Sequence, residues 1–195
     1  MPMSTRAAVL ALLVLIEPVF AQSPVPVPFP EGYRTRLVKY AVVDRADGFS
    51  RDLFVSRDAL EALQRNPRLP ELPVGALLAI DAHSARVVSE DRKTGAPTFE
   101  TTPQGRLVAA KDERTLHVMR KTQAGFGSQT WAFGGYDPLT TEPLKLQLPG
   151  DCLLCHQAAL VSDMAFSLSL LKRFAATGEV QYRRCAHPGR QACPF

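Results

Sequence analysis

Alternation of apolar and polar residues is the most regular pattern in this chain, and it predicts strands through the first two thirds. The clearest case is 115–121, where Leu116 and Val118 point to one side of a strand and His117 and Met119 to the other. Other short segments are rich in β-branched, aromatic or purely apolar residues, as is typical of strands. We predict strands at 37–43, 51–55, 74–80, 84–89, 106–110, 115–121 and 130–136.

Two segments have the apolar spacing of amphipathic helices instead. A helix over 57–64 places Leu60 and Leu63 on one face. A longer helix is predicted over 162–177, where five large apolar side chains supply the buried face. With no internal repeat, these elements predict a single α+β domain over residues 22–180, rich in strands and with few helices.

The first residues have the features of a secretory signal. Arg6 supplies the positive charge, and the apolar run 7–16 that follows is too short to span a bilayer. Pro18 breaks this run, and cleavage is predicted after Ala21, so residues 1–21 would be removed. An uncleaved membrane anchor is the alternative. The folded part is exported in both cases, and no other apolar run is long enough to span a membrane.

The charge pattern does not indicate a particular class of binding partner. The formal net charge is +4, and no block of basic residues is present. Opposite charges stand side by side at three places: Asp44 and Arg45, Arg51 and Asp52, and Arg57 and Asp58. This interleaving is typical of an ordinary solvated surface, and it argues against a nucleic-acid-binding protein.

Candidate chemistry is concentrated at Cys152-Leu153-Leu154-Cys155-His156. Two thiols three positions apart can form thioethers to the two vinyl groups of one haem, and the adjacent histidine can reach the iron. A disulfide or a zinc site is the alternative. Zinc needs about four ligands, and only Cys185 with His187 offers another pair. The motif therefore predicts one covalent haem c held by Cys152 and Cys155, with His156 as iron ligand.

The other two cysteines have a different role. Cys185 and Cys193 lie in a short tail, 181–195, which contains proline and glycine. An exported protein meets oxidising conditions, in which two such cysteines can form a disulfide that stabilises a loose terminus. We predict that disulfide.

The late position of the haem motif does not fit the usual small helical electron carriers, whose motif lies near the N-terminus. Further segments carry a family resemblance together with the motif: Gly32-Tyr33-Arg34, Arg51-Asp52-Leu53-Phe54-Val55, Val74-Gly75, His117-Val118-Met119-Arg120-Lys121, Trp131-Ala132-Phe133 and Asp163-Met164-Ala165-Phe166-Ser167. In this order they resemble the cytochrome P460 and cytochrome c′-beta family, from about Tyr33 to Phe166.

The resemblance implies a periplasmic homodimer with a mainly antiparallel β sheet and haem attached near the C-terminal end. It implies a five-coordinate haem iron with His156 as the proximal ligand. Relatives of this kind bind small nitrogenous molecules such as nitric oxide, and some oxidise hydroxylamine.

Two positions depart from the hydroxylamine-oxidising members. Those enzymes cross-link a lysine to the haem ring, and Ile80 falls at that position here. They also have an acidic residue shortly after the haem histidine, whereas Leu160 lies in a segment with no acidic residue before Asp163. By this resemblance, Ile80 and Leu160 are candidate haem-pocket residues that favour ligand binding over oxidation.

Three residues before the first helix are candidates for the distal side of the haem. Arg51 matches a distal arginine of the family, and its guanidinium can donate hydrogen bonds to a bound ligand or a haem propionate. A surface arginine paired with Asp52 or Asp58 is the alternative. Phe49 and Phe54 are candidates for an aromatic wall, although Phe54 on a strand is also an ordinary core residue.

Other ligands to the iron are weaker candidates. His83 and His117 are single histidines on strands, which are usually structural or exposed. Met119 and Met164 could complete a six-coordinate iron, but Met164 lies only eight residues after His156.

Four functions remain open at this stage. The leading one is a five-coordinate haem protein that binds nitric oxide or related ligands. The alternatives are a hydroxylamine-oxidising enzyme, an electron-transfer cytochrome with a redox partner protein, and a haem-free exported domain with two disulfides.

Overall fold

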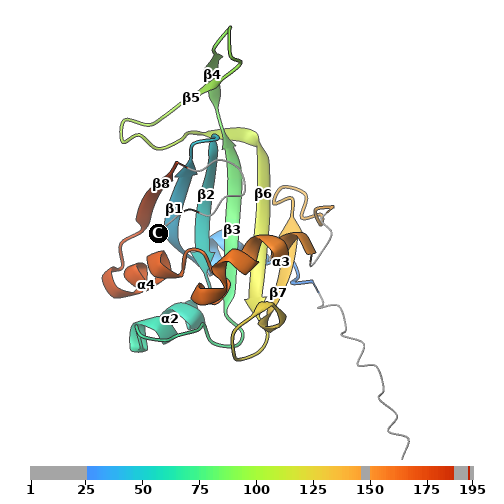
Figure 1. Ribbon diagram of the computed structural model, residues 1–195, viewed down its shortest axis with the longest axis vertical. Coiled ribbons are helices and arrows are strands. Elements are labelled where there is room, and N and C mark those ends of the chain that lie inside the picture. Colours follow the sequence, from blue (N-terminus) through green and yellow to red (C-terminus); the bar gives the residue numbers. More distant parts are fainter. Residues whose placement is uncertain (1–25, 146–149, 187–192, 194–195) are drawn as a thin grey trace, which may run out of the picture.

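The computed structural model describes residues 26–145, 150–186 and 193. The expected signal peptide and His187 lie outside this part. A six-stranded sheet forms the centre, in the order β7-β6-β3-β2-β1-β8. In that order the strands are β7 (Trp131–Tyr136), β6 (Ala109–Lys121), β3 (Leu77–Ala85), β2 (Phe49–Val55), β1 (Val38–Arg45) and β8 (Gln181–Cys185). All neighbours are antiparallel except β1 and β8 (Figure 1).

The remaining elements surround this sheet or project from it. A short hairpin of β4 and β5 extends beyond one end of the sheet (Figure 1). These elements are α1 (Tyr33–Arg36), α2 (Arg57–Arg65), β4 (Val87–Glu90), β5 (Pro97–Phe99), η1 (Ser128–Thr130), α3 (Gly150–His156), η2 (Gln157–Ser162) and α4 (Leu168–Thr177). The expected α+β class with a mainly antiparallel sheet is therefore confirmed.

The strand register divides the sheet into two faces. Leu53 pairs with Ile80, and Ile80 pairs with His117, so these three side chains share one side. We call this side the helix face, because α2, α3 and α4 lie over it (Figure 1). Its core joins the sheet to all three helices through residues such as Leu63, Leu171 and the half-buried Cys152.

The opposite side, which we call the N-terminal face, is covered by the segment before β1. Val27 and Tyr33 pack there against Phe54 and neighbouring strand residues. The Tyr33 hydroxyl donates a hydrogen bond to the buried Asp81 carboxylate at 2.7 Å. Separate cores on the two faces explain how one sheet holds both the N-terminal segment and the helices in place.

Several elements differ from the sequence-based expectations. The two strands expected at 106–110 and 115–121 form one long strand, β6, and the strand expected from 74 begins at Leu77. The helix expected from 162 begins at Leu168, after the 3₁₀ helix η2. Residues 181–185, expected as part of a loose tail, form β8 beside β1. The domain therefore continues past residue 180.

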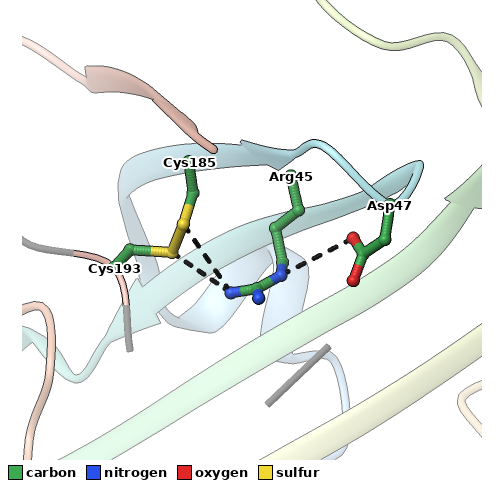
Figure 2. Close-up of a disulfide and its surroundings, with 4 residues drawn as sticks. All are labelled: Arg45, Asp47, Cys185 and Cys193. Carbon is green, nitrogen blue, oxygen red and sulfur yellow. Dashed lines mark hydrogen bonds and ion pairs between the residues drawn. A yellow bond between two sulfur atoms is a disulfide. The ribbon is translucent and has the colours of Figure 1, made fainter. Parts of the chain in front are cut away.

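The disulfide expected between Cys185 and Cys193 is confirmed, with 5.6 Å between the Cα atoms. Figure 2 shows the buried Arg45 guanidinium between this disulfide and Asp47. Its Nη1 lies 3.1 Å from Cys193 Sγ, and its Nε lies 3.6 Å from an Asp47 carboxylate oxygen. The disulfide thus ties Cys193 to the end of β8, where the bridge contacts the buried Arg45 at the end of β1.

Candidate haem-attachment site

Helix α3 carries all three residues of the CxxCH motif. Because Cys152 and Cys155 are three positions apart on a helix, their thiols lie on the same side of it. Both side chains are half-buried, and neither forms a disulfide with another described residue. Leu153 packs against the core of the helix face, whereas Leu154 is 71% exposed. The helix therefore presents two thiols at the spacing that thioether attachment of haem requires.

His156 is held in one orientation by a main-chain group. Its Nδ1 lies 2.5 Å from the carbonyl oxygen of Met164. Since a carbonyl oxygen only accepts hydrogen bonds, Nδ1 must carry a proton, and in the neutral ring Nε2 then holds the free lone pair. A histidine that binds a metal typically has this arrangement, with its second nitrogen donating to a carbonyl.

The surroundings of His156 favour its neutral form. Burial lowers the pKa of the imidazole most strongly, and the positive charge of Arg51 lowers it further, while the bond to Met164 opposes both. The rings of Phe133 and Phe166 each lie 5.3 Å from the imidazole ring, between centroids. A neutral imidazole in an aromatic environment is suited to bind iron through Nε2.

Arg51 lies on the helix face and is close enough to Cys155 and His156 to interact electrostatically with both. Burial lowers the pKa of Arg51, and the positive charge of Arg45 lowers it further, whereas Asp47 raises it. Within the described residues, its guanidinium makes no hydrogen bond or ion pair. The alternative of a surface pair with Asp52 is not seen among the described residues, where Asp52 pairs with Lys39 at 2.7 Å.

His117 is also brought to this region. It shares the helix face with Arg51 and Ile80, and its Nε2 lies 3.3 Å from the Thr115 hydroxyl. Burial lowers the pKa of His117, and the positive charges of Arg51 and His156 lower it further. The sequence pattern gave this histidine little weight, yet the fold places it near the haem motif.

The two family-derived positions lie on different elements near the motif. Ile80 is half-buried on the helix face, between Leu53 and His117. Leu160 lies on η2 and is 44% exposed, and its neighbour Val161 is 98% exposed. Ile80 thus belongs to the sheet side of the site, and Leu160 to the segment that follows the haem histidine.

The structure separates the two phenylalanines. Phe54 pairs with Ala79 on the N-terminal face and belongs to its core, so it does not line the site. Phe49 is on the helix face but 45% exposed, beside a cavity of about 450 Å³ near the β4–β5 hairpin. Neither forms an aromatic wall next to His156. That position is taken by Phe133 and Phe166.

The structure also places the other residues that were considered as iron ligands. His83 is buried on the N-terminal face, away from the motif. Met119 is part of the core of the helix face. Met164 is fully buried, and its own carbonyl binds the Nδ1 side of His156.

The family comparison agrees with this geometry. Residues 30–167 match the family model described as Cytochrome P460. The chain belongs to the cytochrome P460 family. No curated protein gives a significant match to the chain. The matched segment runs from the N-terminal turn to the residues just after the haem motif, so it includes the whole site described above.

Membership of the cytochrome P460 family implies a haem, and the residues of this chain fit one. The thiols of Cys152 and Cys155 suit covalent attachment, and His156 offers a neutral Nε2. No described residue pairs with the Arg51 guanidinium. It is therefore available to donate hydrogen bonds to a haem propionate or to a polar ligand. Exposed apolar side chains next to the motif, Leu154 and Leu160 among them, suit contact with a porphyrin.

Sequence reasoning did not assign roles to three groups of this site: the Met164 carbonyl and the rings of Phe133 and Phe166. Phe133 and Phe166 belong to segments that carried the family resemblance, but a motif match does not reveal which ring contacts the histidine. A sequence pattern does not show which main-chain carbonyl will accept a hydrogen bond from a histidine. Its only indication was the short separation between His156 and Met164.

Proposed function

We propose that this chain is an exported c-type cytochrome with one haem, bound through Cys152 and Cys155, whose iron takes a small nitrogenous ligand such as nitric oxide. The observation that carries this proposal is the orientation of His156. Its Nδ1 donates to Met164, so Nε2 alone remains to bind iron. When bound, the haem would supply an iron that can take a small ligand in addition to His156.

A five-coordinate iron is supported by the placement of the other candidate ligands. The Met164 carbonyl accepts a hydrogen bond from His156 Nδ1, so Met164 lies beside the nitrogen that would not bind iron. Met119 is packed in the core of the helix face, and His83 lies on the other face. The Nε2 of His117 has a hydrogen-bond partner in Thr115.

Arg51 supports a polar ligand. Its guanidinium has donors to spare and lies on the side of the sheet that faces α3. In this proposal it donates hydrogen bonds either to the bound ligand or to a haem propionate, and its positive charge strengthens either bond. Ile80 next to it is apolar and admits a small ligand without adding a competing donor.

Two features support ligand binding over hydroxylamine oxidation. Ile80 has no amine with which to cross-link a haem ring. Asp163, the first described acidic residue after His156, is fully buried and accepts hydrogen bonds from Leu72 and Trp131, so its carboxylate is not free to act as a base.

The proposal also covers where the protein acts and what it associates with. The family resemblance and the sequence of residues 1–21 point to the periplasm, to a homodimer, and to a redox partner protein that keeps the iron reduced. Within the described residues, no helix is long and apolar enough to cross a membrane.

The deciding experiment is the absorption spectrum of the ferrous protein, produced with the haem-attachment machinery, with and without nitric oxide. We expect a five-coordinate spectrum that changes on addition of nitric oxide or carbon monoxide, and a mass that corresponds to two thioether bonds. The control is Cys152→Ala with Cys155→Ala, which should carry no covalent haem. A ferrous protein that stays six-coordinate and takes up neither gas would refute the proposal.

A further inference from the structure

Asp163 is a buried carboxylate with an unusual number of donors. It is 0% exposed, and one of its oxygens accepts a hydrogen bond from the main-chain amide of Leu72 at 2.8 Å. The other oxygen accepts hydrogen bonds from Trp131 Nε1 at 3.2 Å and from the Lys121 ammonium group. A buried carboxylate is retained in a fold only when its acceptor sites are satisfied in this way.

The three donors come from different parts of the fold. Leu72 lies in the loop after α2, Lys121 ends β6 and Trp131 begins β7. Lys121 is itself fully buried and also pairs with Glu71 at 3.2 Å. Asp163 therefore fixes the segment after the haem motif to the sheet and to the α2 loop at one point.

The backbone at this point adopts a conformation that must be held. Asp163 and Met164 both have positive φ angles, 51° and 61°, which are uncommon for residues other than glycine. Two such residues in succession persist only where surrounding contacts fix them. The resulting turn directs the Met164 carbonyl back toward His156, 2.5 Å from Nδ1.

We propose that Asp163 is a positioning residue for the haem histidine, a role that rests on the proposed function. By holding the turn at 163–164, it fixes the Met164 carbonyl, and this carbonyl sets the orientation and basicity of the His156 ring. A stronger hydrogen bond at Nδ1 makes Nε2 a better electron donor to iron, which stabilises the ferric state.

The test compares Asp163→Asn with the matched control Glu71→Gln. Both variants remove one carboxylate partner of Lys121, but only the first disturbs the turn that carries Met164. In Asp163→Asn we expect the iron–histidine stretching frequency of the ferrous protein to fall and the reduction potential to rise. In Glu71→Gln both quantities should remain at the wild-type values.

A second readout reports on the hydrogen bond itself. In the diamagnetic ferrous carbon monoxide complex, the His156 Nδ1 proton should exchange with solvent roughly tenfold faster in Asp163→Asn, the effect of losing about one net hydrogen bond. If the ferrous protein is six-coordinate, the proposed function fails. A six-coordinate ferrous haem is itself diamagnetic, so the exchange rate of the Nδ1 proton can then be measured without carbon monoxide. The role of Asp163 is thus tested separately from the proposed function.

A milder variant serves if Asp163→Asn does not fold. Trp131→Phe removes one donor to Asp163 and leaves the carboxylate with Leu72 and Lys121. We expect smaller shifts in the same directions. A folded variant of either kind with an unchanged stretching frequency and an unchanged exchange rate would overturn the positioning role.

Discussion

Arg51 and Phe54 belong to the same strand but lie on opposite faces of the sheet. Arg51 is on the helix face near Cys155, whereas Phe54 packs with the N-terminal segment. The ring of Phe54 meets that of Tyr33 edge-on, at 5.6 Å between centroids. The two residues therefore have separable roles, one at the candidate haem site and one in the core of the N-terminal face.

Phe54→Ala should destabilise the protein without changing the haem. Loss of a buried phenylalanine costs about 3–5 kcal/mol of the free energy of unfolding, while the ferrous spectrum and the uptake of nitric oxide should stay as in the wild type. Urea unfolding and absorption spectroscopy measure the two effects. The control Phe49→Ala, at a side chain that is 45% exposed, should cost less than about 1 kcal/mol. A changed spectrum in Phe54→Ala would place this ring at the haem instead.

Arg51→Gln should weaken the hold on the ligand or on the haem propionate. A hydrogen bond from a charged donor contributes about 1.5–3 kcal/mol, so we expect nitric oxide to dissociate about 10- to 100-fold faster if Arg51 contacts the ligand. If it contacts a propionate instead, the reduction potential should change and the dissociation rate should not. Stopped-flow kinetics and potentiometry distinguish the two.

The matched control for Arg51 is Arg86→Gln. It removes the same charge from the chain, but Arg86 pairs with Glu100 at 2.8 Å near the β4–β5 hairpin. Neither the dissociation rate nor the potential should move. If Arg51→Gln behaves like this control, Arg51 has no contact with either group.

His83 should make the protein less stable in acid. Burial lowers the pKa of His83 below its usual value of 6.5, against a weaker opposing effect of Asp52, and among the described residues its Nδ1 has no hydrogen-bond partner. Between the lowered pKa and about 6.5, the unfolded chain binds a proton that the folded protein does not. The stability that His83 contributes is therefore complete above pH 6.5 and is lost as the pH falls below it.

His83→Gln removes this titration. Its free energy of unfolding should fall less steeply than that of the wild type between about pH 7 and pH 5, and urea unfolding at several pH values measures the difference. Equal slopes for the two proteins would show that His83 is not responsible for acid sensitivity.

The disulfide should contribute measurably to stability. Cys185 and Cys193 are eight positions apart, and closing so short a loop contributes about 2–3 kcal/mol in the chain-entropy description. We expect the free energy of unfolding of the double variant Cys185→Ser, Cys193→Ser, measured by urea unfolding, to be lower than that of the wild type by this amount. A reducing agent should lower the stability of the wild type but not of the variant, since thioether bonds to haem resist reduction. A variant as stable as the wild type would contradict this.

The sequence predicted the main strands of the sheet because the segment 115–121 alternates with a period of two and the others are rich in β-branched, aromatic or apolar residues. The same period already separates Arg51 from Phe54, since residues three positions apart on a strand point to opposite sides. The expectation that both line one pocket did not apply this alternation. The spacing of the two cysteines and the histidine located the haem motif, but the family segments could not show which of their side chains contact it.

Some elements were not predicted from the sequence, and each case has a physical reason. Gln181-Tyr182-Arg183-Arg184-Cys185 has too few apolar residues to indicate a strand, and it becomes one because β1 offers it hydrogen bonds. Pro97 disfavours a strand, yet it is tolerated at the start of the short β5. The turn at Asp163 and Met164 is stabilised by contacts from distant segments, and such contacts leave no local pattern.

The pairing of β8 with β1 has a consequence for how the chain avoids aggregation. Without β8, the apolar segment Ala41-Val42-Val43 would belong to an edge strand with open hydrogen-bonding groups, which is a template for another chain. β8 covers that edge and presents Arg183 and Arg184 in its place, and charges of this kind discourage further pairing. The sheet is therefore protected only when the last strand in the sequence has docked, and a chain that ends before residue 181 should self-associate.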